Sequence, residues 1–186
     1  QGTCPQDDWA HAQCRQQHVV YLANSSGLKV GITRQSQVPT RWIDQGAKQA
    51  VPIFKVANRY QAGVVEVALK AFVSDRTNWR TMLKQDVASI DLLTARDELL
   101  KQAENMVNAA VTEFNEDDII PLTDVVTTEL TYPILKYPEK ITSLSFEKTS
   151  VIEGRLQGIK GQYLILDTGV INIRKFSGYV IQCGVS

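Results

Sequence analysis

The residues best suited to chemistry lie in residues 18–34, which read as two short strands joined by a polar turn containing Gly27. Side chains alternate along a strand, so Tyr21, Lys29 and Gly31 share one face of this hairpin. A phenol and an ammonium beside a glycine can bind an anion such as a phosphate. The alternative is an amphipathic hairpin whose polar side is only solvated. The opposite face is wholly apolar and consists of Val20, Leu22, Leu28, Val30 and Ile32.

Residues of the types that bind zinc gather just before and at the start of the hairpin: Cys4, His11, Cys14 and His18. A closed zinc site needs four ligands, and the usual C-x-x-C pair is absent from this stretch. Two interpretations are open. These residues form an irregular zinc site, complete or continued by cysteines further upstream, or they are ordinary buried thiols and surface histidines.

Hydrophobic periodicity predicts the elements that position these residues. A third strand is expected over residues 51–57, and helices are expected from Thr40 to about Ala50, over residues 60–73 and over residues 87–116. Arg41 then lies in the first turn of the first helix. Glu66 lies off the centre of the apolar stripe of the second helix, with Lys70 four residues further on. From about residue 129 the composition turns to short β segments separated by glycine-containing turns.

We therefore predict an α+β fold. It comprises a small three-stranded antiparallel sheet flanked by helices, then a long helix, then a small all-β barrel or sandwich at the C-terminus. The expected organisation is a zinc-site segment at residues 1–17, an α/β domain with the long helix at residues 18–118, and a β-rich domain at residues 119–186.

Length and composition narrow the class of protein. With 186 residues of which 44% are hydrophobic, the chain can bury a packed core and is not disordered. No apolar run approaches a membrane span, and the chain starts at Gln1 with neither a methionine nor a signal peptide, so we expect a segment upstream. Three cysteines, the third being Cys183, suit a reducing compartment, so we expect a cytoplasmic protein with no membrane partner.

The charge is unevenly spread although the net charge is zero. Residues 1–60 carry seven Lys/Arg against three Asp/Glu, whereas residues 84–126 carry three against ten. A nucleic acid would therefore bind the first part of the chain. In the β-rich part, basic residues beside tyrosines offer further contacts with nucleic acid, or are only solvated: Lys160, Arg174 and Lys175 beside Tyr163 and Tyr179.

A set of residues within about residues 18–83 resembles the GIY-YIG nuclease superfamily in residue type, order and spacing. The set comprises Val20-Tyr21, Lys29-Val-Gly31 with Thr33, Arg41, Glu66 and Asn78. It is most similar to the divergent branch whose second motif reads Lys-Ile-Gly or Lys-Val-Gly. It also resembles an uncharacterised bacterial family that carries the stretch from Tyr21 to Arg34 after a cysteine-containing leader, which favours the zinc site.

This resemblance implies hydrolysis of phosphodiester bonds in DNA or RNA with one divalent cation, Mg²⁺ or Mn²⁺. Tyr21 would activate or position the attacking water, Arg41 would steady the phosphate, and Glu66 would hold the metal. Such charges neutralise an anionic diester during attack, and one carboxylate can hold a hydrated hard cation. Lys29 joins the catalytic group, and the residues assigned to substrate binding are Gly31, Thr33, Arg34 and Asn78.

Lys29 departs from the superfamily, which usually has a tyrosine at this position. Two outcomes are open: Lys29 contacts the phosphate and lowers the pKa of the Tyr21 phenol, or the site has lapsed into binding. We therefore keep two alternatives to the nuclease. One is a catalytically inactive nucleic-acid-binding protein with the same fold, and the other is a protein-interaction scaffold that uses the acidic long helix.

Overall fold

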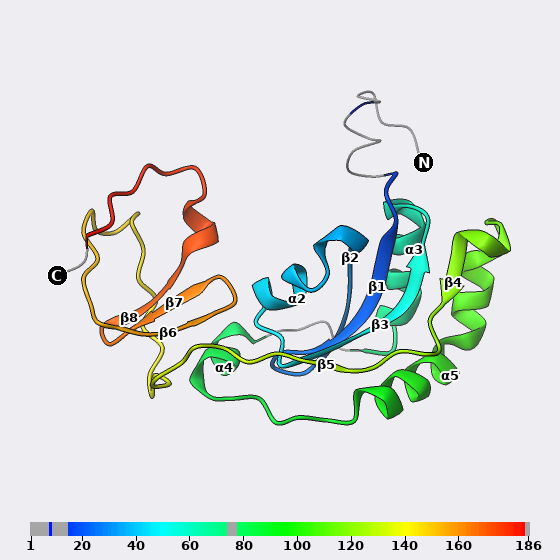
Figure 1. The fold of residues 1–186 in the computed structure, drawn as a ribbon, viewed down its shortest axis with the longest axis horizontal. Helices are drawn as coiled ribbons and strands as arrows, with labels where there is room; N and C mark the ends of the chain where they lie inside the picture. The colour runs from blue at the N-terminus through cyan, green and yellow to red at the C-terminus, as the bar shows by residue number, and fades with distance from the viewer. Residues whose placement is uncertain (1–7, 9–14, 74–77, 185–186) are drawn as a thin grey trace.

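The computed structural model describes residue 8 and residues 15–73 and 78–184, and shows an α+β fold with two antiparallel sheets (Figure 1). The larger sheet contains β1 (His18–Asn24), β2 (Leu28–Arg34), β3 (Gln49–Val56), β4 (Ile119–Pro121) and β5 (Thr128–Glu129). Its order is β2-β1-β3-β4, with β5 also paired to β3. The prediction of three strands is wrong because β4 and β5 are too short to show any hydrophobic period in the sequence.

The hairpin of β1 and β2 has the predicted register, with Tyr21 directly opposite Gly31. One of its faces belongs to the main hydrophobic core, as the alternation predicts. On that face Val20, Leu22 and Val30 are buried, while Leu28 and Ile32 pack against the core.

Two helices cover this apolar face, α3 (Arg59–Lys70) and α5 (Leu92–Val111) (Figure 1). α3 begins at a capping box in which Asn58 Oδ1 accepts a hydrogen bond from the Gln61 amide at 3.0 Å. α5 is shorter than the predicted 87–116 at both ends, and it starts at Leu92 because Asp91 caps it, accepting a hydrogen bond from the Thr94 amide. Within the described ranges, no helix combines the length and the apolar sequence that crossing a bilayer requires.

The opposite face of the sheet is covered by the chain between β2 and β3. This chain forms the 3-10 helix η1 (Gln35–Gln37), α2 (Thr40–Asp44) and a turn. Trp42, Ala47 and Ala50 pack here against the β1 side chains. The predicted helix to about Ala50 is wrong beyond Asp44, because Gly46 takes a φ angle of 66° that ends the helix.

The C-terminal unit, residues 130–184, contains a separate sheet of β6 (Leu156–Lys160), β7 (Tyr163–Leu166) and β8 (Gly169–Asn172) in the order β6-β7-β8. Residues 116–118 form η2 (Glu116–Asp118) before β4, and η3 (Ile173–Phe176) follows β8. We predicted a barrel or a sandwich here; among the described residues this unit has one open sheet and no closed barrel, so the barrel is wrong. The short β segments expected from residue 129 are fewer than predicted: residues 151–155 and 179–181 have no strand pairing, and residues 134 and 143 form only isolated bridges.

The short helix α4 (Trp79–Lys84) lies between the two sheets (Figure 1). Met82 and Leu83 are buried together with Ile165 and Val170 of the C-terminal unit. Trp79 stacks on the ring of Tyr163, with the centroids 5.5 Å apart and the planes 6° from parallel. The C-terminal unit therefore shares a hydrophobic core with the first part of the chain.

Candidate functional site

Tyr21 is the centre of the candidate site. Its side chain has no exposed surface, and its hydroxyl donates a hydrogen bond to Gln45 Oε1 at 2.9 Å. The ring packs edge-on against Trp42, with the centroids 5.9 Å apart. The interpretation of this side of the hairpin as solvated is therefore wrong, because α2 and the turn after it cover Tyr21.

Gly31 gives Tyr21 the space that its ring occupies. A Cβ atom at position 31 would lie 2.6 Å from Tyr21 Oη and 2.7 Å from Cζ. No side chain fits at that separation. Gly31 was expected to contact the substrate, but in the structure Tyr21 fills the space over this glycine.

Charged side chains on two other elements change the pKa of Tyr21. Burial raises the pKa of the Tyr21 phenol, the charge of Arg41 and the hydrogen bond to Gln45 act to lower it, and the charge of Glu66 raises it further. Arg41 lies on α2 and Glu66 on α3. The charges of Arg41 and Glu66 thus both act on the phenol of Tyr21, and the cation that lowers its pKa is Arg41. The sequence left open that Lys29 does this.

Glu66 is half-buried, and Lys70 one turn further along α3 forms an ion pair with it, with Nζ 3.3 Å from Oε1. Within the described residues, no group of three His, Cys, Asp or Glu side chains is arranged to hold a metal ion. The donor set at Glu66 is thus a single carboxylate. It fits a hydrated Mg²⁺ that takes further ligands from a substrate phosphate, and does not fit a closed metal site.

The other residues assigned from β2 lie close to this site. Lys29 and Thr33 share the face of Tyr21 by strand alternation, and each is only 8% exposed. Arg34 is half-buried at the end of β2, opposite His18. Lys29 therefore lies on the predicted face of the hairpin, but its side chain is buried and not exposed to solvent.

Asn78 has a structural role at the start of α4. Its Oδ1 accepts hydrogen bonds from the amides of Arg80 and Thr81 at 3.1 and 3.2 Å. An asparagine in this position is a typical N-cap. Capping accounts for the residue type without any contact with a substrate.

Of the four predicted zinc ligands, three lie outside the described residues: Cys4, His11 and Cys14. His18 begins β1, is buried, and has Nδ1 2.6 Å from the carbonyl oxygen of Gln16. Burial lowers the pKa of His18, and the charges of Arg59 and Arg34 act in the same direction. The zinc site stays a prediction.

Sequence reasoning missed two residues beside Tyr21. Gln45 accepts the hydrogen bond of Tyr21, and Trp42 has a buried Nε1 that finds no hydrogen-bond partner among the described residues. Nothing in the sequence distinguishes Gln45 from the other glutamines. Nothing in the sequence indicates that the Nε1 of Trp42 is buried without a partner.

Lys160 does not offer the surface contact that the sequence suggested. Its side chain is completely buried, whereas Arg174 and Lys175 are exposed. The alternation of side chains along a short strand does not show whether another part of the chain covers Lys160.

A family model described as "Protein of unknown function (DUF2797)" matches residues 1–181. The match is not to the GIY-YIG nuclease superfamily, so the family assignment from the sequence motifs is wrong. The motifs have local structural causes here: Gly31 makes room for Tyr21, and Asn78 caps α4. No curated protein and no solved structure matches the chain.

Proposed function

We propose that this chain, which belongs to the DUF2797 family of unknown function, hydrolyses phosphodiester bonds in DNA or RNA at a site made of Tyr21, Arg41 and Glu66. Since the family carries no activity to transfer, the proposal stands on the residues of this chain alone. The observation that supports it best is the placement of Tyr21 against α2 and the turn after it, through Trp42 and Gln45, where the charges of Arg41 and Glu66 act on its phenol.

That arrangement contains the groups that diester cleavage needs. A guanidinium can neutralise the charge on the phosphate, and a phenol with a raised pKa stays protonated at neutral pH. Tyr21 is therefore a neutral phenol and not a general base, and it can donate its one proton to a substrate only after it gives up the hydrogen bond to Gln45. Gln45 accepts from the phenol and fixes its orientation.

A divalent cation fits this proposal through Glu66. Its carboxylate would hold Mg²⁺ or Mn²⁺, which when bound supplies positive charge to the developing anion. Lys70, ion-paired with Glu66, would hold the carboxylate in place before the cation binds.

A second candidate is binding of nucleic acid without cleavage. Two observations favour it: the phenol of Tyr21 is fully buried, and the carboxylate of Glu66 already has a cationic partner. In that case Arg41, which is half-buried, would contact the phosphate backbone.

Cleavage of plasmid DNA and of structured RNA, with Mg²⁺ or Mn²⁺ and then with a chelator, tests the proposal. Glu66→Gln should slow cleavage by about a hundredfold or more, whereas Glu104→Gln, on the exposed side of α5, should not change it. Equal nicking by the Glu66 variant would refute the proposal. Binding without cleavage, weakened by salt and by Arg41→Met, would support the second candidate.

A further inference from the structure

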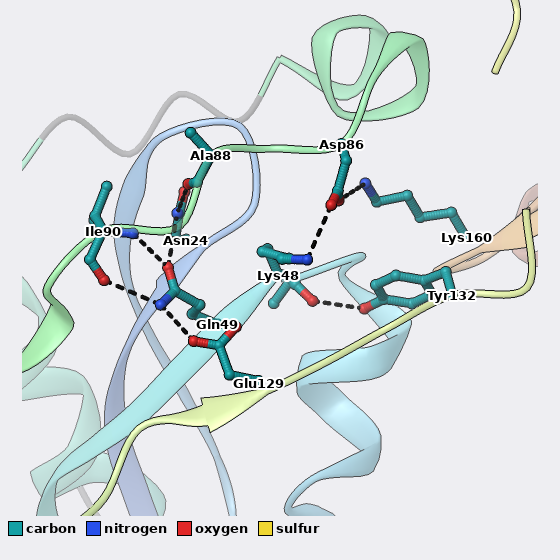
Figure 2. A network of polar contacts seen from close by, with 10 residues as sticks. Asn24, Lys48, Gln49, Asp86, Ala88, Ile90, Glu129, Tyr132 and Lys160 are labelled. Carbon is teal, nitrogen blue, oxygen red and sulfur yellow. Dashed lines mark hydrogen bonds and ion pairs between the residues drawn. The ribbon is translucent and has the colours of Figure 1, made fainter.

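The turn that carries Gln45 is held by the C-terminal unit. Tyr132 donates from its hydroxyl to the carbonyl oxygen of Ala47 at 2.8 Å and lies 3.3 Å from that of Ile43. These two carbonyls flank Gln45 on both sides. Figure 2 shows Tyr132 reaching across to the chain beside Lys48.

A second part of the same unit closes on this turn. Gly161, between β6 and β7, has a φ angle of 59°. A Cβ atom there would lie 2.8 Å from the carbonyl oxygen of Asp44 and 3.0 Å from the amide nitrogen of Gly46. The backbone of the β6–β7 turn therefore touches the residues immediately before and after Gln45.

Lys160 lies next to both of these contacts, because it precedes Gly161 in the chain and its ammonium faces the ring of Tyr132. Its ammonium has no hydrogen-bond partner within the part of the chain that the structure describes, and it lies 5.6 Å from the ring centroids of both Tyr132 and Tyr137. Its nearest carboxylate is Asp86, with Oδ1 3.9 Å away, and the other oxygen of Asp86 binds Lys48 Nζ at 2.9 Å (Figure 2). The buried ammonium of Lys160 therefore lies between the carboxylate of Asp86 and the ring of Tyr132, and the cation–π contact restrains that ring.

We infer that the C-terminal unit positions the candidate site: Tyr132, Lys160 and Gly161 hold the Asp44–Ala47 turn, and the turn sets the position of Gln45 and of the Tyr21 hydroxyl. These are positioning residues, since their contacts reach Tyr21 only through Gln45. The consequence for cleavage rests on the function proposed above. The link from Tyr132, Lys160 and Gly161 to the position of Tyr21 does not rest on that function, and it can be measured without a substrate.

The test is Tyr132→Phe, which removes the hydroxyl and keeps the ring beside Lys160. The matched control is Tyr179→Phe, whose ring packs on Phe176 and which makes the same chemical change in the same unit. Backbone amide exchange should accelerate about fivefold at Gly46, Ala47 and Lys48, the change that the loss of one hydrogen bond supports. The ring ¹³C resonance of Tyr21, assigned with Tyr21→Phe, should shift.

Lys160→Met is the second variant, because it removes the charge while keeping a side chain that fills the space. It should move the Tyr21 resonance in the same direction as Tyr132→Phe. If both variants lower stability but leave the Tyr21 resonance and the exchange of the turn unchanged, these residues are only structural and the inference is overturned. The inference is also overturned if Tyr179→Phe has equal effects. A shift of Tyr21 in a protein that cleaves nothing would refute the proposed function and leave the coupling intact.

Discussion

Gly31→Ala should destabilise the protein although it adds only one methyl group. The new Cβ atom would lie 2.6, 2.7 and 3.1 Å from Oη, Cζ and Cε2 of Tyr21. The ring cannot move aside easily, because it is fully buried and packs against Trp42. The substitution therefore forces either the strand or the phenol out of position.

The expected cost has two parts. Overpacking of a buried site by a methyl group costs about 1–3 kcal/mol. Displacement of the phenol also breaks the hydrogen bond to Gln45, which contributes roughly 1 kcal/mol. The free energy of unfolding should fall by about 2–4 kcal/mol in total.

Denaturant titration measures this change, and Gly63→Ala is the matched control. Gly63 lies within α3 with open space where its Cβ atom would be, so this change should raise stability by up to about 1 kcal/mol. In a Tyr21→Leu background, which lacks the three atoms of Tyr21 that clash, Gly31→Ala should cost less than about 1 kcal/mol. A cost below about 0.5 kcal/mol in the wild-type chain, or an equal cost in both backgrounds, would refute this account of the packing.

Three further changes test other parts of the structure. Burial holds the pKa of His18 below 6.5, so His18 becomes protonated in the unfolded chain at a higher pH than in the folded protein. The free energy of unfolding should therefore fall as the pH drops below about 6.5. In His18→Asn, the urea midpoint should no longer show this part of the pH dependence. Asn78→Ala should cost about 1 kcal/mol by removing the cap of α4, with the cleavage rate unchanged; a lower rate at full stability would show a contact with substrate instead. Protein purified without chelator should contain stoichiometric zinc, and its absence would end the proposal of a site at His18 with Cys4, His11 and Cys14.

The hairpin could be predicted from the sequence because only one register of its two strands buries all of its apolar side chains on one face. Only the observed pairing places Val20, Leu22 and Val30 in one core, and the same pairing leaves Tyr21 facing the other way. Whether the second face is covered depends on a different segment. Trp42 and the turn after it provide that cover, and the alternation of β1 carries no information about them.

Features that depend on contacts distant in sequence were missed. β4 and β5 have two or three residues each and exist because the edge of β3 is available to them. Lys160 looks like a surface residue of a short strand, and it is buried because residues distant in sequence, Tyr132, Tyr137 and Asp86, lie around its ammonium. Gln45 has no sequence signal because its role depends on a turn that Gly46 creates.

The measurement that tests the central claim most directly compares cleavage rates of Tyr21→Phe, Glu66→Gln and the double variant under one set of conditions. If the phenol and the carboxylate act as one site, each single change slows cleavage by about a hundredfold. The double variant should then be little slower than the slower single variant, because residues that act as a unit are not additive. Losses that multiply, or a wild-type protein that cleaves no phosphodiester, would contradict the claim.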